Sequence, residues 1–95
     1  MNNLKFIIEK LLEITSTLTI IIGKLLDLVG KLDEYLYNFK ICNDLLKQIN
    51  KEYNYNVNLF NLKDYEEKLN SLLNVIKSYG LDVLDMFENI RECNE

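Results

Sequence analysis

The sequence predicts an all-α protein in which long heptad-patterned helices form a hairpin that completes a four-helix bundle by oligomerisation. Three observations predict it. The 95 residues include no proline and only three glycines, so few positions force the backbone to break. Large apolar residues recur at heptad spacing through most of the chain. One asparagine-rich segment separates two such stretches. We therefore treat residues 1–95 as a single helical domain.

The first heptad stretch predicts a helix over about 3–51. Apolar residues fill position a of seven repeats, and a second series fills position d, whereas three or four repeats suffice to identify a coiled-coil seam. Position a holds Leu4, Leu11, Leu18, Leu25, Leu32, Phe39 and Leu46, and position d holds Ile7, Ile14, Ile21, Leu28, Tyr35, Cys42 and Ile49. Position e adds Ile8, Ile22, Val29 and Leu36, which widens the apolar stripe as a helical bundle requires.

Gly30 is the main alternative end point for this helix. Gly23 and Gly30 both occupy position f, farthest from the seam, and the heptad phase continues unchanged beyond them. These facts favour one long helix. In the alternative, the chain turns near Gly30 and closes a monomeric three- or four-helix bundle.

Residues 52–61 predict an extended, asparagine-rich connector. Between residues 53 and 59, Tyr53, Tyr55, Val57 and Leu59 alternate with asparagines, and such alternation is typical of a strand. No second segment offers a partner strand, and an isolated strand is not stable. We expect an extended connector that lies against the end of the bundle. The alternative is an exposed edge that pairs with another chain.

A second helix is predicted over about 62–93. Asn61 is suited to cap its first turn, and acidic residues follow where the helix dipole favours them. Gly80 marks a possible kink. The seam of this helix comprises Leu62, Tyr65, Leu69, Leu72, Ile76, Tyr79, Val83, Met86, Ile90 and Cys93.

Helix lengths favour association with another chain. The two helices would extend about 70 Å and about 45–50 Å, so folding back leaves part of the longer apolar stripe uncovered. A second copy would complete the core, and a dimer or tetramer is expected. The expected oligomer seam comprises Leu4, Ile7, Leu11, Ile14, Leu18, Ile21, Leu25, Leu28, Leu32, Tyr35, Leu69, Leu72 and Ile76.

Composition argues against several function classes. The net charge is −4 and the basic residues are scattered, whereas nucleic-acid surfaces cluster lysine and arginine. The longest uncharged run, residues 14–23, is too short to span a bilayer. No signal-peptide pattern is present, so we expect a cytoplasmic protein. Cys42 and Cys93, both at position d, are expected to be small buried apolar residues.

Catalytic and metal-binding patterns are not found in this sequence. There is no histidine, and none of the three serines has a recognisable general base nearby. The acidic row Asp82, Asp85, Glu88 and Glu92 has helical spacing, but a solvated face explains it better than a metal site. We therefore expect no enzyme activity, no cofactor and no bound metal.

The function that remains is a non-enzymatic protein–protein interaction module, such as an adaptor, a chaperone-like factor or an inhibitor. A self-assembling structural coiled-coil subunit is the alternative, and a membrane-surface amphipathic protein is the third. Membrane binding is disfavoured because acidic residues balance the lysines of the first helix. The partner-binding candidates are the aromatic residues Tyr37, Tyr53, Tyr55 and Phe60, because aromatics are enriched at binding hot spots.

Overall fold

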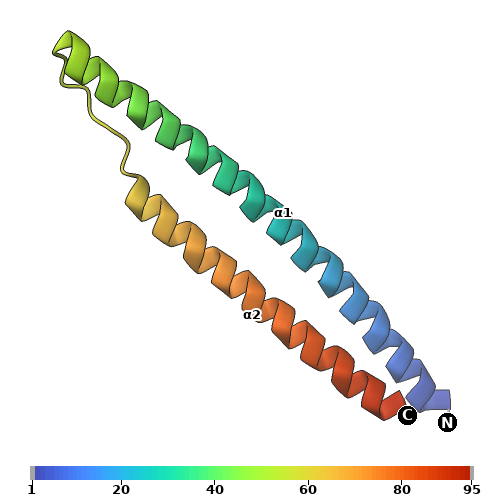
Figure 1. The fold of residues 1–95 in the computed structure, drawn as a ribbon. Coiled ribbons are helices and arrows are strands. Elements are labelled where there is room, and N and C mark those ends of the chain that lie inside the picture. The colour runs from blue at the N-terminus through green and yellow to red at the C-terminus, as the bar shows by residue number, and fades with distance from the viewer. Residues whose placement is uncertain (1, 95) are drawn as a thin grey trace.

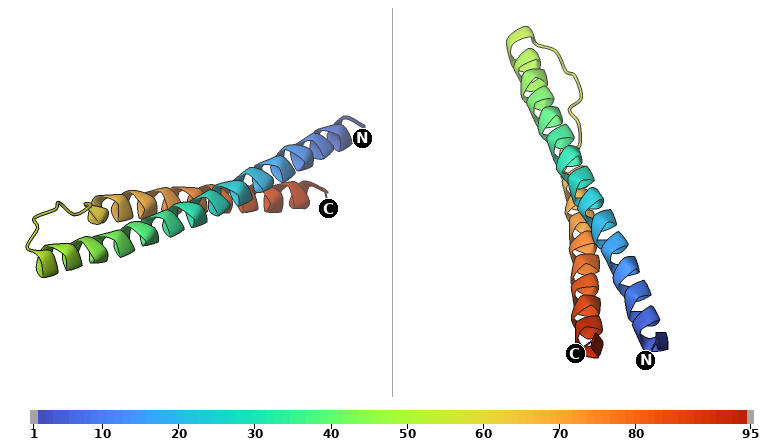
Figure 2. Two further views of the ribbon diagram at one scale, coloured as in Figure 1. Left: turned by 90° about the horizontal axis from the view of Figure 1, so that it is seen from above. Right: turned by 90° about the vertical axis from the view of Figure 1, so that its right-hand side faces the viewer.

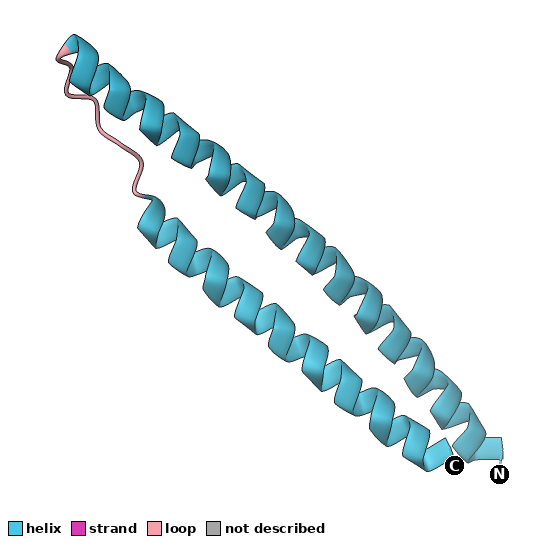
Figure 3. Ribbon diagram, in the orientation of Figure 1, coloured by secondary structure: helices cyan, strands magenta, loops and turns pink. Residues whose placement is uncertain are grey.

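The protein folds as an antiparallel hairpin of two long helices. The computed structural model describes residues 2–94, in which α1 spans Asn2–Tyr53 and α2 spans Leu62–Asn94. The helices contain 52 and 33 residues, and the N- and C-terminal ends lie at the same end of the hairpin (Figure 1, Figure 3). The prediction of an all-α helical hairpin is confirmed. Of the predicted domain 1–95, Met1 and Glu95 lie outside the described residues.

Neither glycine expected to interrupt a helix does so. Gly30 lies inside α1 and Gly80 lies inside α2, so the alternative fold with a turn near Gly30 is wrong. A methyl group added at Gly23 or Gly30 would have no neighbour within 4 Å, apart from the helix's own backbone. Both glycines therefore occupy the outer surface of α1, where a missing side chain removes no packing contact.

An asparagine determines where α1 ends. Asn54 follows the last helical residue and has a φ of 58°, in the left-handed region. Asparagine is the residue that most often takes this conformation after glycine, and one left-handed residue reverses the chain direction at a helix C-terminus. The chain then runs extended from residue 55 to 61 (Figure 1). Asn61 directly precedes α2, and Asp64 lies in the first turn of that helix.

The inside of the hairpin is lined by one row of α1. Its buried residues are separated by seven or fourteen positions and all occupy position e: Ile8, Thr15, Val29, Leu36 and Asn43. Ile22 and Asn50 continue the row as half-buried residues, and position a supplies the half-buried neighbours Leu18, Leu25, Phe39 and Leu46. On α2, where Leu62 is taken as position a and Tyr65 as position d, the buried residues Ile76, Val83 and Ile90 occupy position a.

Position d is therefore not part of the hairpin's interior. The a/d pattern predicts both series in one seam, but the hairpin packs through positions a and e instead. A single partner helix can cover only about two adjacent rows of side chains. With three adjacent apolar rows available on α1, one row must remain outside.

The hairpin is long and thin. Its Cα atoms extend 78 × 15 × 14 Å, and the two helices cross at a shallow angle (Figure 2). Such a shape has one layer and little interior. Six apolar residues are buried in the described chain: Ile8, Val29, Leu36, Ile76, Val83 and Ile90.

Candidate interaction face

Apolar side chains on one side of the hairpin are left without a partner. We define the apolar face by the position-d residues that stay exposed on both helices. On α1 they are Ile7, Ile14, Ile21, Leu28 and Tyr35, and on α2 they are Tyr65, Leu72, Tyr79 and Met86. Their exposed fractions run from 36% at Met86 to 62% at Tyr35. No charged residue interrupts either series.

The two series lie on the same side because the helices are antiparallel. Rotation by 180° about an axis normal to the plane of the hairpin exchanges the two antiparallel helices. The rotation leaves the same side of the hairpin facing the viewer, so position d of α1 and position d of α2 lie on the same side. One groove is accordingly lined by Leu32 and Tyr35 from α1 and by Tyr65 and Leu72 from α2. The face thus combines both helices into one surface.

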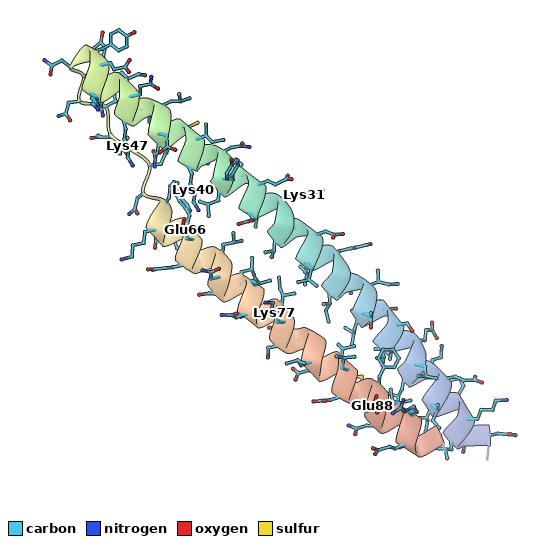
Figure 4. The ribbon with its side chains drawn as sticks, in the orientation of Figure 1. Lys31, Lys40, Lys47, Glu66, Lys77 and Glu88 are labelled. Carbon is cyan, nitrogen blue, oxygen red and sulfur yellow. The ribbon has the colours of Figure 1, made fainter. Side chains whose placement is uncertain are left out.

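The opposite side of the hairpin carries charged residues among its apolar ones. There, Lys40 of α1 forms an ion pair with Glu66 of α2, with 2.8 Å between Nζ and Oε1 (Figure 4). The hydrogen bond and the negative charge of Glu66 raise the pKa of Lys40 above its ordinary value. The row of α1 on this side is mixed, because it contains Lys5, Leu12, Thr19, Leu26, Asp33, Lys40 and Lys47. The hairpin therefore has one apolar side and one side on which apolar and charged residues alternate.

An aromatic groove indents the apolar face where α2 begins. It has a volume of about 450 Å³ and is lined by Leu32, Tyr35, Leu36, Phe39, Phe60, Tyr65, Lys68, Leu69 and Leu72. The ring centroids of Tyr35 and Phe39 are 4.7 Å apart, and those of Phe39 and Phe60 are 4.6 Å apart, both edge to face. This is the favoured geometry for aromatic pairs. The connector thus contributes Phe60 to the groove.

Lys68 is the one charged residue that lines this groove. Its Nζ lies 3.0 Å from the Asp64 carboxylate, which raises the pKa of Lys68 by hydrogen bonding and charge. The remaining polar groups of the lining side chains are the hydroxyls of Tyr35 and Tyr65. In pockets that bind small molecules, several polar groups normally point toward the ligand. This open, mostly apolar groove is better suited to a protruding apolar side chain.

Two asparagines of α1 hold the connector in place, and we call them the asparagine clamp. Asn43 donates from Nδ2 to the Phe60 carbonyl (3.0 Å), and its Oδ1 accepts from the Phe60 N–H (2.8 Å). Asn50 makes the same pair of bonds with Val57, at 3.0 and 2.8 Å. Each side-chain amide therefore replaces the backbone partner that a neighbouring strand would supply.

The spacing of the clamp is set by two different periods. Asn43 and Asn50 are seven residues apart on a helix, which places them about 10.5 Å apart. Val57 and Phe60 are three residues apart in an extended chain, which spans about 9–10 Å. Two turns of helix thus match three extended residues. An extended chain with a threefold repeat, rather than the twofold repeat of a strand, turns both backbone groups toward α1.

The connector is accordingly extended but is not a strand. Within residues 2–94 no strand is formed, although the alternation of asparagine with apolar residues is typical of one. The clamp was not predicted from the sequence. One sequence feature could have indicated the clamp. The inner row of α1 is apolar or threonine through Leu36 and then changes to asparagine at Asn43 and Asn50. The change coincides with the replacement of α2 by the connector.

Some residues of the predicted oligomer seam lie in the interior of the hairpin, and the others lie on its exposed surface. Ile76 is buried inside the hairpin, and Leu18, Leu25 and Leu69 are half-buried there. The remaining residues are exposed: Leu4, Ile7, Leu11, Ile14, Ile21, Leu28, Leu32, Tyr35 and Leu72. An intermolecular role for these residues stays a prediction.

The four partner-binding candidates do not form one site. Phe60 lines the aromatic groove. Tyr53 ends α1 and Tyr55 follows in the connector, so these two lie near the tip of the hairpin. Tyr37 occupies position f of α1, outside the hairpin's interior, and is 63% exposed. Only Phe60 therefore joins the apolar face, and a binding role for the four remains a prediction.

Both cysteines differ from expectation. Cys42 and Cys93 are exposed free thiols, whereas the heptad pattern predicted buried side chains. The reason is the one given for the apolar face: both occupy position d, which the hairpin leaves outside. The cysteine side chains are thus exposed at position d, as the neighbouring isoleucines and tyrosines are.

The described residues contain few features suited to other chemistry. Among residues 2–94, no group of three or more cysteine, aspartate or glutamate side chains is placed to hold a metal ion. Neither helix in this part of the chain is long and apolar enough to cross a membrane.

Comparison with known proteins adds no relationship. No protein-family model, curated protein or solved structure matches the chain.

Proposed function

We propose that this protein is a non-enzymatic protein–protein interaction module, in the class of adaptors, chaperone-like factors and inhibitors. In this proposal the apolar face packs against helices of another chain. The single observation that supports it most is the exposed position-d series on one side of both helices. Monomeric proteins rarely expose contiguous apolar patches of this length, and such patches mark interaction sites.

The form of the face favours a helical partner. Its apolar residues follow heptad spacing, and the groove between α1 and α2 runs along the helix axes. An amphipathic helix recognises such a groove through anchors at positions i, i+3, i+4 and i+7. The aromatic groove would receive the largest of these anchors, because edge-to-face rings already line it.

A self-assembling structural subunit is the second candidate function. The observation that favours it is the extent of the apolar face, which runs from Ile7 to Tyr35 on α1 rather than occupying one short patch. In that case the face serves other copies of the same chain alone.

Two adjacent isoleucines provide the test of the proposed function. Ile21 lies on the apolar face and is 46% exposed, whereas Ile20 lies on the outer side of α1 and is 60% exposed. A photo-reactive residue at position 21 should form cross-links to protein in cells that produce the chain. The same residue at position 20 should form few.

The comparison identifies the outcome that would overturn the proposal. If positions 20 and 21 give the same adducts, or if neither gives any, the apolar face is not a protein-binding surface. Helicity measured by circular dichroism should be equal in both variants, because both side chains are exposed in the hairpin.

A further inference from the structure

We propose that the occupant of the apolar face is a second copy of this chain. The two hairpins would form a closed, twofold-symmetric four-helix bundle, in which each α1 lies against α2 of the partner copy. This inference rests on the second candidate function given above, self-assembly through the apolar face, and it names the assembly that would form.

The exposed area supports a partner of this size. The hairpin exposes 7972 Å², whereas a compact folded chain of its mass exposes about 5,700 Å². The excess is about 2,200 Å² per chain. The face is about 50 Å long, set by α2, and about 20 Å wide, set by two helix diameters. Pairing would bury about 1,000 Å² per copy, more than the roughly 800 Å² of a standard stable interface.

The apolar face also matches a second copy of itself. Its α1 series includes the β-branched residues Ile7, Ile14 and Ile21, whereas its α2 series includes the aromatic residues Tyr65 and Tyr79. When α1 lies against the partner's α2, aliphatic and aromatic side chains can interdigitate, which favours close packing.

Charge selects which helices become neighbours. Helix α1 carries seven basic and seven acidic residues and is neutral, whereas α2 carries four basic and seven acidic residues, a net charge of −3. Two adjacent α2 helices would repel one another. In the row that borders the face on α2, Lys68, Val75, Asp82 and Asn89 carry no net charge. If each α2 lies beside the partner's α1, the α2 helices therefore separate the lysines that border the face on the two α1 helices. These lysines are Lys10, Lys24 and Lys31.

The one-sided distribution of apolar residues predicts a closed dimer. The opposite side of the hairpin carries the Lys40–Glu66 ion pair and the charged residues Lys5, Asp33 and Lys47. Once two apolar faces pair, the exposed apolar residues left on the opposite side, such as Leu12 and Leu26, alternate with polar and charged residues and do not form a comparable apolar row. An isologous contact of this kind closes on itself.

The first experiment measures absolute mass by light scattering on a sizing column over a concentration series. The wild-type chain should have twice its 11.3 kDa mass. Ile21→Glu should shift the chain to monomer, with at least a 100-fold weaker association, because pairing would bury an unpaired carboxylate. Ile20→Glu introduces the same group one residue away, on the outer side, and should remain a dimer.

A second experiment tests the orientation in the dimer without disturbing the apolar face. Glu9 lies at position f, on the outer side of α1 and near its start. A spin label at Glu9→Cys, in a chain with Cys42→Ser and Cys93→Ser, reports one distance between copies. Parallel α1 helices place the labels about 30 Å apart, across the bundle. Antiparallel α1 helices place them about 55 Å apart, along it.

Several outcomes would overturn this inference. They are a monomeric wild-type chain throughout the concentration series, a mass that grows beyond two copies, a dimer that survives Ile21→Glu, and a label distance near 55 Å. If Ile21→Glu lost helicity, the label distance would still decide the matter. A monomer that cross-links another protein through position 21 alone would contradict the second copy and leave the proposed function standing.

Discussion

At the scale of single residues, the most informative position is a buried asparagine. Asn43 is 8% exposed and occupies the row that is apolar or threonine from Ile8 to Leu36. Its side-chain amide makes both of its hydrogen bonds with the backbone of Phe60. A buried polar group is stable only when it is paired in this way. The asparagine therefore fits the inner row because the segment facing it is an extended backbone rather than a helix.

Replacement of this asparagine should release the connector. In Asn43→Ala, the N–H and carbonyl of Phe60 lose their partners, and we expect the free energy of unfolding to fall by about 1–3 kcal/mol. Urea denaturation followed by circular dichroism measures this change. Hydrogen exchange at the Phe60 amide should become faster in the same variant.

A matched control exists on the same helix. Asn38 is exposed on α1 and lies outside the row that contains the clamp. Asn38→Ala should therefore leave the free energy of unfolding within about 0.5 kcal/mol of wild type. If both variants were equally stable, the clamp would contribute nothing to the fold.

At the scale of elements, the sequence predicts both helices and the connector from periodicity. It does not predict which row of α1 faces α2. Positions a, d and e are all apolar over most of α1, and a pattern read from one helix cannot show which two rows its neighbour covers. Likewise, Phe60 could be predicted as a binding candidate from its type. Its place in the aromatic groove depends on the clamp, which requires the three-dimensional match between helix and connector.

Gly30 provides the test of helix continuity. It lies in the interior of α1, and a methyl group added there would meet no neighbour within 4 Å. Gly30→Ala should raise the free energy of unfolding by about 1 kcal/mol, because alanine has the higher helix propensity. Thermal and urea denaturation measure it.

The equivalent position one heptad earlier should respond alike. Gly23→Ala has the same open surroundings, and the two effects should add because the side chains share no contact. Destabilisation by either alanine would mean that the backbone there is not a regular helix.

At the scale of the whole molecule, the hairpin has a small interior for its length. Six apolar side chains are buried in the described residues, while the molecule extends 78 Å. A structure with so little core gains much of its stability from whatever covers the apolar face. Folding and association should therefore be coupled.

Coupling predicts that stability depends on protein concentration. The midpoint of thermal unfolding should rise by several degrees over a 100-fold increase in concentration, because mass action favours the associated state. Differential scanning calorimetry over that range measures the shift. In Ile21→Glu the midpoint should be lower and independent of concentration, and a constant midpoint in the wild-type chain would contradict the coupling.

The asparagine clamp also limits how the length of this chain can change. Two further helical turns inserted between Asn43 and Asn50 would require three more residues between Val57 and Phe60. The reason is that two helical turns and three extended residues cover nearly the same distance. A single inserted residue on either side would move one asparagine away from its backbone partner. Lengthening of this hairpin should therefore proceed in coupled steps of seven residues and three, so that its helix and its connector change size together.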